Sequence, residues 1–252
     1  MRMVETIWGL APPARARTKR PRRGERGRQR SLAEARTWGG RREGAGRKAA
    51  QRPNVEHYRR PDLVWSCPVH ATLRRAKGLP SLRNELLRRV VREVIDATRN
   101  ARPDVFRIVE YSIQADHVHL IVEAEGKREL SSGMRSFAIR VARRVNDVLR
   151  RARGRVWGDR YHRHDLPSPT EVRRALVYVL SNHLKHDDEP DLALLDPCSS
   201  GPWFRGWMHT REPARDPPPV AAPVTWLLRE GWHRYGGGYI TLGERPRAAR
   251  SV

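Results

Sequence analysis

The sequence contains little cysteine and no long apolar run. Its two cysteines, Cys67 and Cys198, lie far apart among 252 residues and form no CxxC pair. This usage argues against a zinc ribbon and against a disulfide scaffold, and it suits a reducing cytoplasm. No apolar run approaches the roughly 18–20 residues that span a bilayer, and the basic N-terminal stretch lacks the apolar segment of a secretory signal. A cytoplasmic protein without a membrane partner is therefore predicted.

Acidic residues are also scarce. Asp and Glu number 28 against 51 Lys and Arg, which gives a formal net charge of +23. A charge this large attracts polyanions, and nucleic acid is the usual partner, so association with the nucleoid is expected. The excess is concentrated in residues 1–50, which hold 15 Lys/Arg and 4 Asp/Glu. That segment has no sustained apolar periodicity, and residues 1–55 are predicted to form a disordered basic arm.

From Pro61 onward apolar residues recur with regular spacing. Alternation predicts strands, and apolar residues at i, i+4 and i+8 predict helices. The first strand is expected to be broken near Pro68, and the short link 114–116 predicts an antiparallel hairpin. The predicted order is strand, helix, strand, strand, helix, strand, over residues 63–73, 82–100, 105–112, 117–123, 128–151 and 161–166. This is the order of an α+β, ferredoxin-like split βαβ fold, with an antiparallel four-stranded sheet and two helices.

A third helix is predicted after the last strand. Ser168 and Glu171 match a capping box, and Pro169 suits the first helical position, so this helix is expected to begin at about residue 169. Beyond residue 187 Pro and Gly become frequent. We therefore expect a folded domain over residues 58–187 and a Pro/Gly-rich C-terminal extension over 188–252. Within that extension, the stretch around Trp226–Ile240 is expected to form small structure of its own.

Two histidines lie two residues apart on the strand predicted over 117–123. Side chains alternate faces along a strand, so His117 and His119 should point to one side while Val118 and Leu120 point into the core. Two imidazoles on one face of a rigid strand can both bind a divalent ion. The H-x-H pattern alone is weak, because two histidines on a solvated edge produce it as well.

The third helix carries a tyrosine and an amide one turn apart. At 100° per residue, its apolar face contains Val172, Leu176, Val179, Leu180 and His183. Tyr178 and Asn182 should lie on the opposite face, flanked by Arg174 and Lys185. Residues four apart on a helix are neighbours, so these two side chains could approach a metal site together. An ordinary surface tyrosine gives the same pattern.

Together these segments resemble a known family. In the HUH-type single-strand DNA transposases, among them the REP-associated tyrosine transposases, a ferredoxin-like domain contains a His-hydrophobic-His strand. A following helix bears the nucleophilic tyrosine and, about one turn later, an amide residue. The matching segments are PVHATLRRAKGLPSLR, QADHVHLIVE, VWGDRYHRHDL and EVRRALVYVLSNHLKH, within roughly residues 60–187. Some members have glutamine as the third metal ligand, where this chain has the shorter Asn182.

The resemblance implies a metal-dependent tyrosine DNA transposase or endonuclease. His117 and His119 would bind Mg²⁺ or Mn²⁺ with Asn182 as third ligand, and Tyr178 would attack the scissile phosphate. The products would be a 5′-phosphotyrosine and a free 3′-hydroxyl, and a second strand end could then rejoin the DNA, as in transposition and recombination. The implied partner is single-stranded DNA, cut near hairpins, or hairpin DNA itself. Relatives include homodimers that exchange the tyrosine helix and monomers that do not.

Several further residues are candidates for DNA contacts. Arginines on the second and third helices would hold phosphates, and aromatic side chains would stack on bases. These candidates are Arg140, Arg144, Arg174, Lys185, Trp157 and Tyr161.

Other residues compete for the catalytic roles. His162-Arg163-His164 is also H-x-H, but its middle residue is an arginine, which is not expected to pack into a core. Tyr161 and Tyr111 are alternative nucleophiles. Tyr178 is favoured over Tyr161, which lies on a predicted strand without an amide partner, because a nucleophile needs positioned partners.

Two other functions fit the same scaffold. A ferredoxin-like sheet also serves non-catalytic nucleic-acid-binding proteins, although the chain has 3 Phe and no aromatic pair on a strand of the kind that RNA-binding modules use. Relaxases and replication-initiation nucleases also use HUH histidines, but they are usually longer, and this sequence has no helicase-like P-loop.

Overall fold

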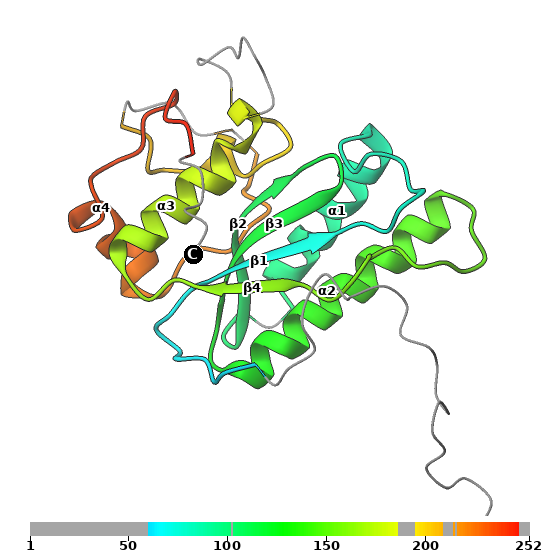
Figure 1. The fold of residues 1–252 in the computed structure, drawn as a ribbon, viewed down its shortest axis with the longest axis horizontal. Helices are drawn as coiled ribbons and strands as arrows, with labels where there is room; N and C mark the ends of the chain where they lie inside the picture. The colour runs from blue at the N-terminus through cyan, green and yellow to red at the C-terminus, as the bar shows by residue number, and fades with distance from the viewer. Residues whose placement is uncertain (1–59, 102, 186–194, 209–213, 215, 247–252) are drawn as a thin grey trace, which may run out of the picture. The chain divides into compact units, whose positions relative to one another are not determined.

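The computed structural model describes residues 60–101, 103–185, 195–208, 214 and 216–246 (Figure 1). These residues all belong to one compact unit, residues 51–252. The basic arm predicted over residues 1–55 and the boundary predicted at residue 187 lie outside the described residues. Among the residues described, every helix is too short or too polar to cross a membrane.

Four strands form the central sheet: β1 (Val69–Arg74), β2 (Phe106–Ile113), β3 (His117–Ala124) and β4 (His162–Asp165). Their order across the sheet is β2-β3-β1-β4, and every neighbouring pair is antiparallel. This is the predicted ferredoxin-like arrangement. The first strand begins only after Pro68, which has no N–H for the ladder. Strand structure at Val64 and Trp65 was a wrong prediction, because both lie exposed in the preceding loop and turn.

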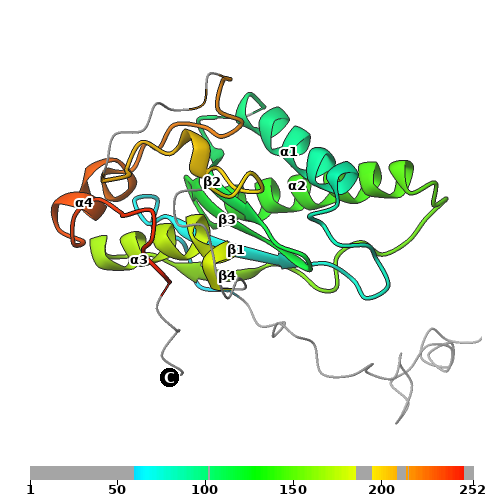
Figure 2. The same ribbon diagram turned by 90° about the horizontal axis from the view of Figure 1, so that it is seen from above.

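Helices α1 (Glu85–Arg99) and α2 (Lys127–Val148) cover one face of the sheet (Figure 2). The α1 helix begins at Asn84, whose side-chain oxygen accepts a hydrogen bond from the Leu86 N–H at 3.1 Å. The apolar faces of both helices pack with the inward residues of the sheet into the main core. The α2 helix ends at Val148, just before Arg150, which adopts a left-handed φ of 51°.

The opposite face is covered by α3 (Pro169–Leu180) (Figure 2). The N-cap half of the predicted capping box forms, because the Ser168 hydroxyl accepts from the Glu171 N–H at 3.3 Å. The Glu171 carboxylate accepts from the Ser168 hydroxyl at 2.8 Å, where a capping box has the backbone N–H of the first residue as donor. The apolar residues of α3 form a second core with Ile121 from the sheet and with Trp207 and Trp232 from the C-terminal extension. The helix is therefore buried on two sides, where the sequence predicts a single apolar stripe.

The C-terminal extension is attached along the outer edge of the sheet. Its residues 198–200 run antiparallel to β2, with the Ile113 N–H donating to the Cys198 carbonyl at 2.8 Å and the Ser200 N–H donating to the Tyr111 carbonyl at 3.0 Å. An unpaired strand edge is a template for aggregation. The extension therefore protects the β2 edge as well as covering α3.

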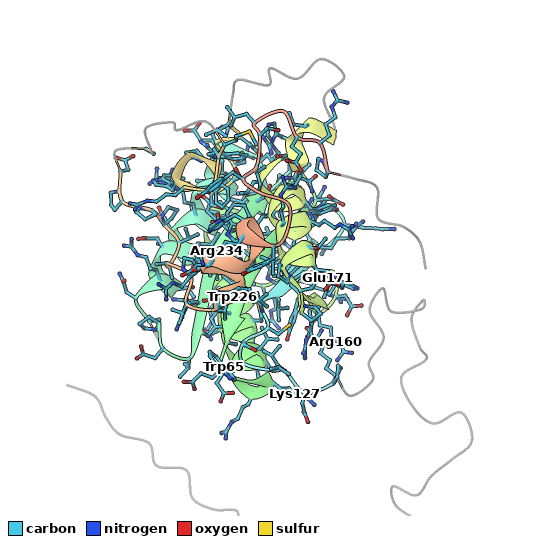
Figure 3. The ribbon with its side chains drawn as sticks, turned by 90° about the vertical axis from the view of Figure 1, so that its left-hand side faces the viewer. Trp65, Lys127, Arg160, Glu171, Trp226 and Arg234 are labelled. Atoms are coloured by element: carbon cyan, nitrogen blue, oxygen red, sulfur yellow. The ribbon has the colours of Figure 1, made fainter. Side chains whose placement is uncertain are left out.

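Short helices of the extension lie against the outer side of α3 (Figure 1). They are a π-helix (Leu227–Gly231) and α4 (Trp232–Arg234). Arg173 of α3 binds both carboxylate oxygens of Glu244, at 2.6 and 2.8 Å. Figure 3 shows Trp226 and Arg234 of the extension on the same face as Glu171 at the start of α3. The stretch around Trp226–Ile240 thus forms small helices, as the sequence predicts, but their buried residues share one core with α3.

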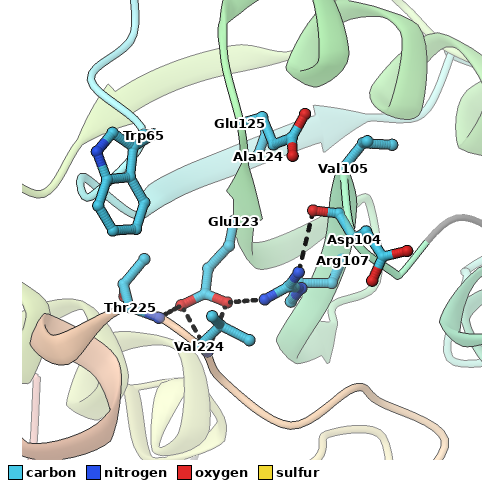
Figure 4. Close-up of a pocket in the computed structure, with 9 residues that line it drawn as sticks. All are labelled: Trp65, Asp104, Val105, Arg107, Glu123, Ala124, Glu125, Val224 and Thr225. Atoms are coloured by element: carbon cyan, nitrogen blue, oxygen red, sulfur yellow. Dashed lines mark hydrogen bonds and ion pairs between the residues drawn. The ribbon is translucent and has the colours of Figure 1, made fainter.

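A buried carboxylate joins the extension to the sheet (Figure 4). Glu123 near the end of β3 is 3% exposed. Its oxygens accept hydrogen bonds from the backbone N–H groups of Val224 at 2.9 Å and Thr225 at 2.8 Å, and one of them lies 3.4 Å from a guanidinium nitrogen of Arg107. These groups line an open cavity of about 200 Å³ beside the exposed ring of Trp65. Glu123 therefore attaches the backbone just before the π-helix to the sheet.

A second buried acid, Glu110, predicts how stability depends on pH. Burial raises its pKa to about 8, and the hydrogen bond from the Ser200 hydroxyl lowers it only in part. The folded chain therefore keeps this proton between about pH 4.5 and 8 while the unfolded chain loses it, so stability should fall as the pH rises through that range.

The expected measurement is denaturant unfolding of the wild type and Glu110→Gln at pH 5 and pH 8. The wild type should lose roughly 3 kcal/mol more than the variant between the two pH values. Parallel pH profiles for the two proteins would show that Glu110 does not titrate in this way. The exposed Glu125→Gln serves as the control, with an unchanged profile.

Candidate functional site

Five histidines share the face of the sheet that α3 partly covers, and we call it the histidine face. Residues directly opposite one another in an antiparallel pair point to the same side. The register places Thr72 opposite both His119 and His162, and Arg74 opposite His117. It also places His70 opposite His164. The histidine face therefore contains His70, His117, His119, His162 and His164.

His117 and His119 turn their Nε2 atoms toward each other, at 2.7 Å. The rings are edge-on, with centroids 4.4 Å apart and an interplanar angle of 82°. His119 is buried, and His117 is half-buried. As strand alternation predicts, both side chains lie on one face, with Val118 and Leu120 in the main core behind them.

Each Nδ1 atom of the pair has a hydrogen-bond partner. His117 Nδ1 lies 2.6 Å from Asp116 Oδ1. His119 Nδ1 lies 3.1 Å from both the Thr72 hydroxyl and His70 Nε2. A partner at Nδ1 fixes the tautomer and leaves the Nε2 lone pair for a ligand. The two Nε2 atoms are therefore the nitrogens of this pair that are available to bind a ligand.

The charges around the pair are set by burial and by close partners. Burial alone would raise the pKa of Asp116, but the hydrogen bond to His117 and the charges of His117 and Arg74 outweigh it and hold the pKa below its usual value. Arg74 lies 3.4 Å from the Asp116 carboxylate. Burial, together with the charges of nearby histidines, lowers the pKa of His70 to about 4, so that His70 is neutral near pH 7.

Tyr178 reaches the histidine pair from α3. Its ring lies edge-on to His119, with centroids 5.0 Å apart, and 5.6 Å from the ring of His70. The side chain is half-buried and also packs against the second core. The Ser168 N-cap fixes where α3 begins and the extension packs on its outer side, and together they set the position of this tyrosine.

Asn182 follows the helix instead of lying within it. The α3 helix ends at Leu180, and Asn182 begins a 3₁₀ turn (Asn182–Lys185). The predicted helical spacing of Tyr178 and Asn182 is therefore wrong. Ser181 and Asn182 both have low intrinsic helix propensity, which is consistent with the end of the helix at this point. Asn182 is 2% exposed, and its Nδ2 atom has no hydrogen-bond partner among the described residues.

Among the described residues, no three His, Cys, Asp or Glu side chains form a group that could hold a metal ion. Two imidazoles converge, so a cation bound here would need further ligands of another kind. A buried amide or the oxygens of a bound phosphate would suit. The unpartnered amide atom of Asn182 is consistent with the first, since the two ends of an amide are assigned from their partners.

The candidate DNA contacts on α2 lie in the layer on the other side of the sheet. Arg140 donates to the Thr98 hydroxyl on α1, and Arg144 pairs with Glu93 of α1 at 3.1 Å. These two arginines join α1 to α2 and are not brought to the histidine face.

The aromatic candidates are packed, not exposed. Trp157 donates its indole N–H to the Ala138 carbonyl at 2.9 Å, and Tyr161 is buried in the main core beneath the guanidinium of Arg60. Arg174 is exposed on α3, and the backbone of Lys185 ends the 3₁₀ turn. Of the predicted DNA contacts, Arg174 is therefore the exposed side chain on the element that carries Tyr178.

Sequence reasoning missed two residues and the packing of a third. Alternation in VHATLR places His70 and Thr72 on one side of β1, but their contact with His119 depends on the strand register. The case against His162-Arg163-His164 rested on Arg163, which belongs to neither core, as expected. The sequence did not predict that its side chain would be 6% exposed and bind Asp165 through two nitrogens at this edge. His162 and His164 are exposed on the histidine face.

Residues 63–172 match the model of a family described as transposase, IS200 like. Among solved structures, the chain is similar to a REP-associated tyrosine transposase bound to a REP hairpin, at 18% identity and a TM-score of 0.45, over 58% of this chain and 82% of that chain. No curated protein matches the chain. The matched family region includes both histidines of the pair and ends six residues before Tyr178.

Proposed function

We propose that the chain is a DNA-processing protein of the transposase type, as the match of residues 63–172 to the model of IS200-like transposases supports. We further propose that it cleaves single-stranded DNA by forming a covalent bond to Tyr178. The observation that carries the proposal is the approach of Tyr178 to the histidine pair. Its ring lies 5.0 Å from that of His119, whose Nε2 faces His117 Nε2 at 2.7 Å. A nucleophile and a pair of metal-ligating groups thus meet on one face.

The residues of the pair fit a divalent cation, Mg²⁺ or Mn²⁺. In an octahedral site with metal–ligand distances of about 2.0–2.1 Å, two adjacent ligand atoms would lie about 2.9 Å apart, close to the 2.7 Å between the two Nε2 atoms. Asn182 is the proposed third ligand. When bound, the cation would neutralise charge on the scissile phosphate. Imidazole is softer than the oxygen ligands that Mg²⁺ prefers, so Mn²⁺ is the better probe.

The proposed reaction exchanges one phosphodiester for another. The Tyr178 hydroxyl loses its proton and its oxygen attacks phosphorus, while the bond from phosphorus to the 3′ oxygen breaks. The leaving oxygen takes a proton from water and becomes a free 3′-hydroxyl. The downstream fragment stays on the protein through a 5′-phosphotyrosine, which conserves the bond for rejoining to another strand end.

The site also supports an assignment of the DNA path. Arg174 is exposed on the same helix as Tyr178 and would hold a phosphate beside it. Lys185 is proposed to contact the strand near the end of the 3₁₀ turn. Arg140, Arg144, Trp157 and Tyr161 have structural partners or packing of their own, and we do not include them in this path.

The test is covalent capture. The full chain is incubated with Mn²⁺ and a pool of single-stranded oligonucleotides with randomised segments beside a hairpin, labelled at the 5′ or the 3′ end. We expect a band of reduced mobility on a denaturing gel that carries the 3′ label, requires the metal and disappears after protease digestion. Fully duplex DNA serves as the control and should give no such band.

Other outcomes would contradict the proposal in distinct ways. A band that carries the 5′ label would reverse the polarity of attack. Binding without an adduct under any metal would favour a non-catalytic nucleic-acid-binding protein. Cleavage without an adduct would indicate direct hydrolysis in place of a tyrosine intermediate.

A further inference from the structure

His70 contacts both parts of the candidate site. It lies on β1, on the histidine face, with its Nε2 atom 3.1 Å from Nδ1 of His119. Its ring lies 5.1 Å from that of His119 and 5.6 Å from that of Tyr178. No other histidine of this face has a ring contact with Tyr178 except His119 itself, among the residues that the structure describes.

The tautomer of His119 decides whether it can bind a cation. Its Nε2 atom faces His117, so Nε2 must be unprotonated if it is to act as a ligand, and the proton must then sit on Nδ1. A buried N–H needs an acceptor. The acceptors at Nδ1 are His70 Nε2 and the Thr72 hydroxyl, each at 3.1 Å. His117 has the Asp116 carboxylate in the equivalent place, at 2.6 Å.

We propose that His70 is a positioning residue that accepts the Nδ1 proton of His119 and thereby keeps His119 Nε2 free for the cation. The inference rests on the proposed function. Imidazole nitrogen is a stronger acceptor than a hydroxyl, and His70 Nε2 accepts when His70 carries its own proton on Nδ1. His70 also packs beside Tyr178, so one side chain sets the orientation of the ligand and borders the nucleophile.

The experiment compares four variants by their Mn²⁺ affinity, measured without DNA by the electron paramagnetic resonance of free Mn²⁺. His70→Phe retains a ring but removes the acceptor, and it should weaken Mn²⁺ binding by about 10–100-fold. His70→Gln restores an acceptor and should recover most of that loss. Thr72→Val removes the hydroxyl at constant volume and should have a smaller effect. His164→Phe, opposite His70 on β4, is the matched control and should bind like the wild type.

A second readout separates positioning from a general structural role. If His70 acts through the cation, saturating Mn²⁺ should restore adduct formation by His70→Phe, whereas a collapsed site would not recover. Nitrogen-15 NMR of the histidines should show His119 protonated at Nδ1 in the wild type, with this preference reduced in His70→Phe. Circular dichroism and thermal unfolding check that each variant folds.

Distinct results would overturn this inference and the proposed function. Wild-type Mn²⁺ affinity in His70→Phe, a larger loss in Thr72→Val, or a wild type that binds no Mn²⁺ would overturn the role of His70. Mn²⁺ binding that depends on His70, in a protein that forms no adduct with any single-stranded pool, would support the role of His70 while the cleavage proposal fails.

Discussion

Replacement of Tyr178 by phenylalanine is expected to abolish the covalent protein–DNA adduct and to lower cleavage by about a thousandfold or more, because the attacking oxygen is removed. The ring remains, and with it the contacts to His119 and His70 at 5.0 and 5.6 Å. The histidine pair should therefore keep its geometry, and affinity for single-stranded DNA should change little. Adduct gels and filter binding on the same preparations measure the two effects separately.

Tyr111 and Tyr161 are poorly placed to replace Tyr178 as the nucleophile. Tyr111 is 1% exposed in the main core, on the far side of the sheet from the histidine face, and burial raises its pKa far above the ordinary value. Tyr161 is also in the main core, beneath Arg60. Neither side chain can reach a bound phosphate without unpacking that core, so little residual cleavage is expected from them.

The controls for Tyr178→Phe follow from the same packing. Tyr161→Phe should retain the adduct, as should Tyr235→Phe, which changes a tyrosine that is 69% exposed on the extension. The nucleophile assignment would be wrong if the adduct persisted in Tyr178→Phe and vanished in Tyr161→Phe. Loss of DNA binding together with the adduct would indicate that Tyr178 supports the fold of α3.

Local patterns in the sequence predicted much of the fold. Alternation at His117–Glu123 and the helical spacing after residue 82 are properties of neighbouring residues, and so is the capping box at Ser168. The sheet order follows from these elements because few topologies connect them. The strand boundary was missed at Val64 and Trp65, where apolar residues lie exposed before the proline.

Contacts between distant segments were not predictable in this way. That His70 and Thr72 meet His119 depends on the register of β1 against β3, which single-strand patterns do not fix. The α3 helix ends just before Ser181 and Asn182, and the low helix propensity of these two residues does not by itself fix where a helix ends. Arg163 packs because Asp165 lies on the same strand side, a pairing that residue type alone did not indicate.

The burial of α3 on a second side could have been inferred from the sequence. The run from Ala175 to Leu180 is apolar or aromatic at every position, and a helix that is apolar all round is buried. What covers α3 could not be inferred, since Trp207 and the π-helix that starts at Leu227 carry no strong local signal for packing on it. The sequence therefore predicted the helix that bears Tyr178, but not the C-terminal extension that packs against it.

Loss of the Glu123 carboxylate is expected to weaken strongly the attachment of the C-terminal extension to the sheet. Glu123→Ala should lower the free energy of unfolding by about 3 kcal/mol, because the buried Thr225 N–H loses its acceptor and the guanidinium of Arg107 loses its buried partner. Glu123→Gln keeps an acceptor oxygen without the charge, so its effect should be about half as large. Urea unfolding measures both. Exchange of the Thr225 amide should quicken in Glu123→Ala before the amides of β3 respond.

Glu125→Ala provides the matched control for this prediction. Glu125 lies two residues further along the chain, exposed, and its carboxylate has no hydrogen bond or ion pair among the described residues, so its loss should change stability by less than about 0.5 kcal/mol. If Glu123→Ala unfolds like the control, the carboxylate does not anchor the extension. If it is destabilised as expected, adduct formation should fall as well, since the extension packs on the α3 helix that carries Tyr178. A Glu123→Ala variant that is destabilised yet cleaves at the wild-type rate would show that α3 keeps Tyr178 in place without this attachment.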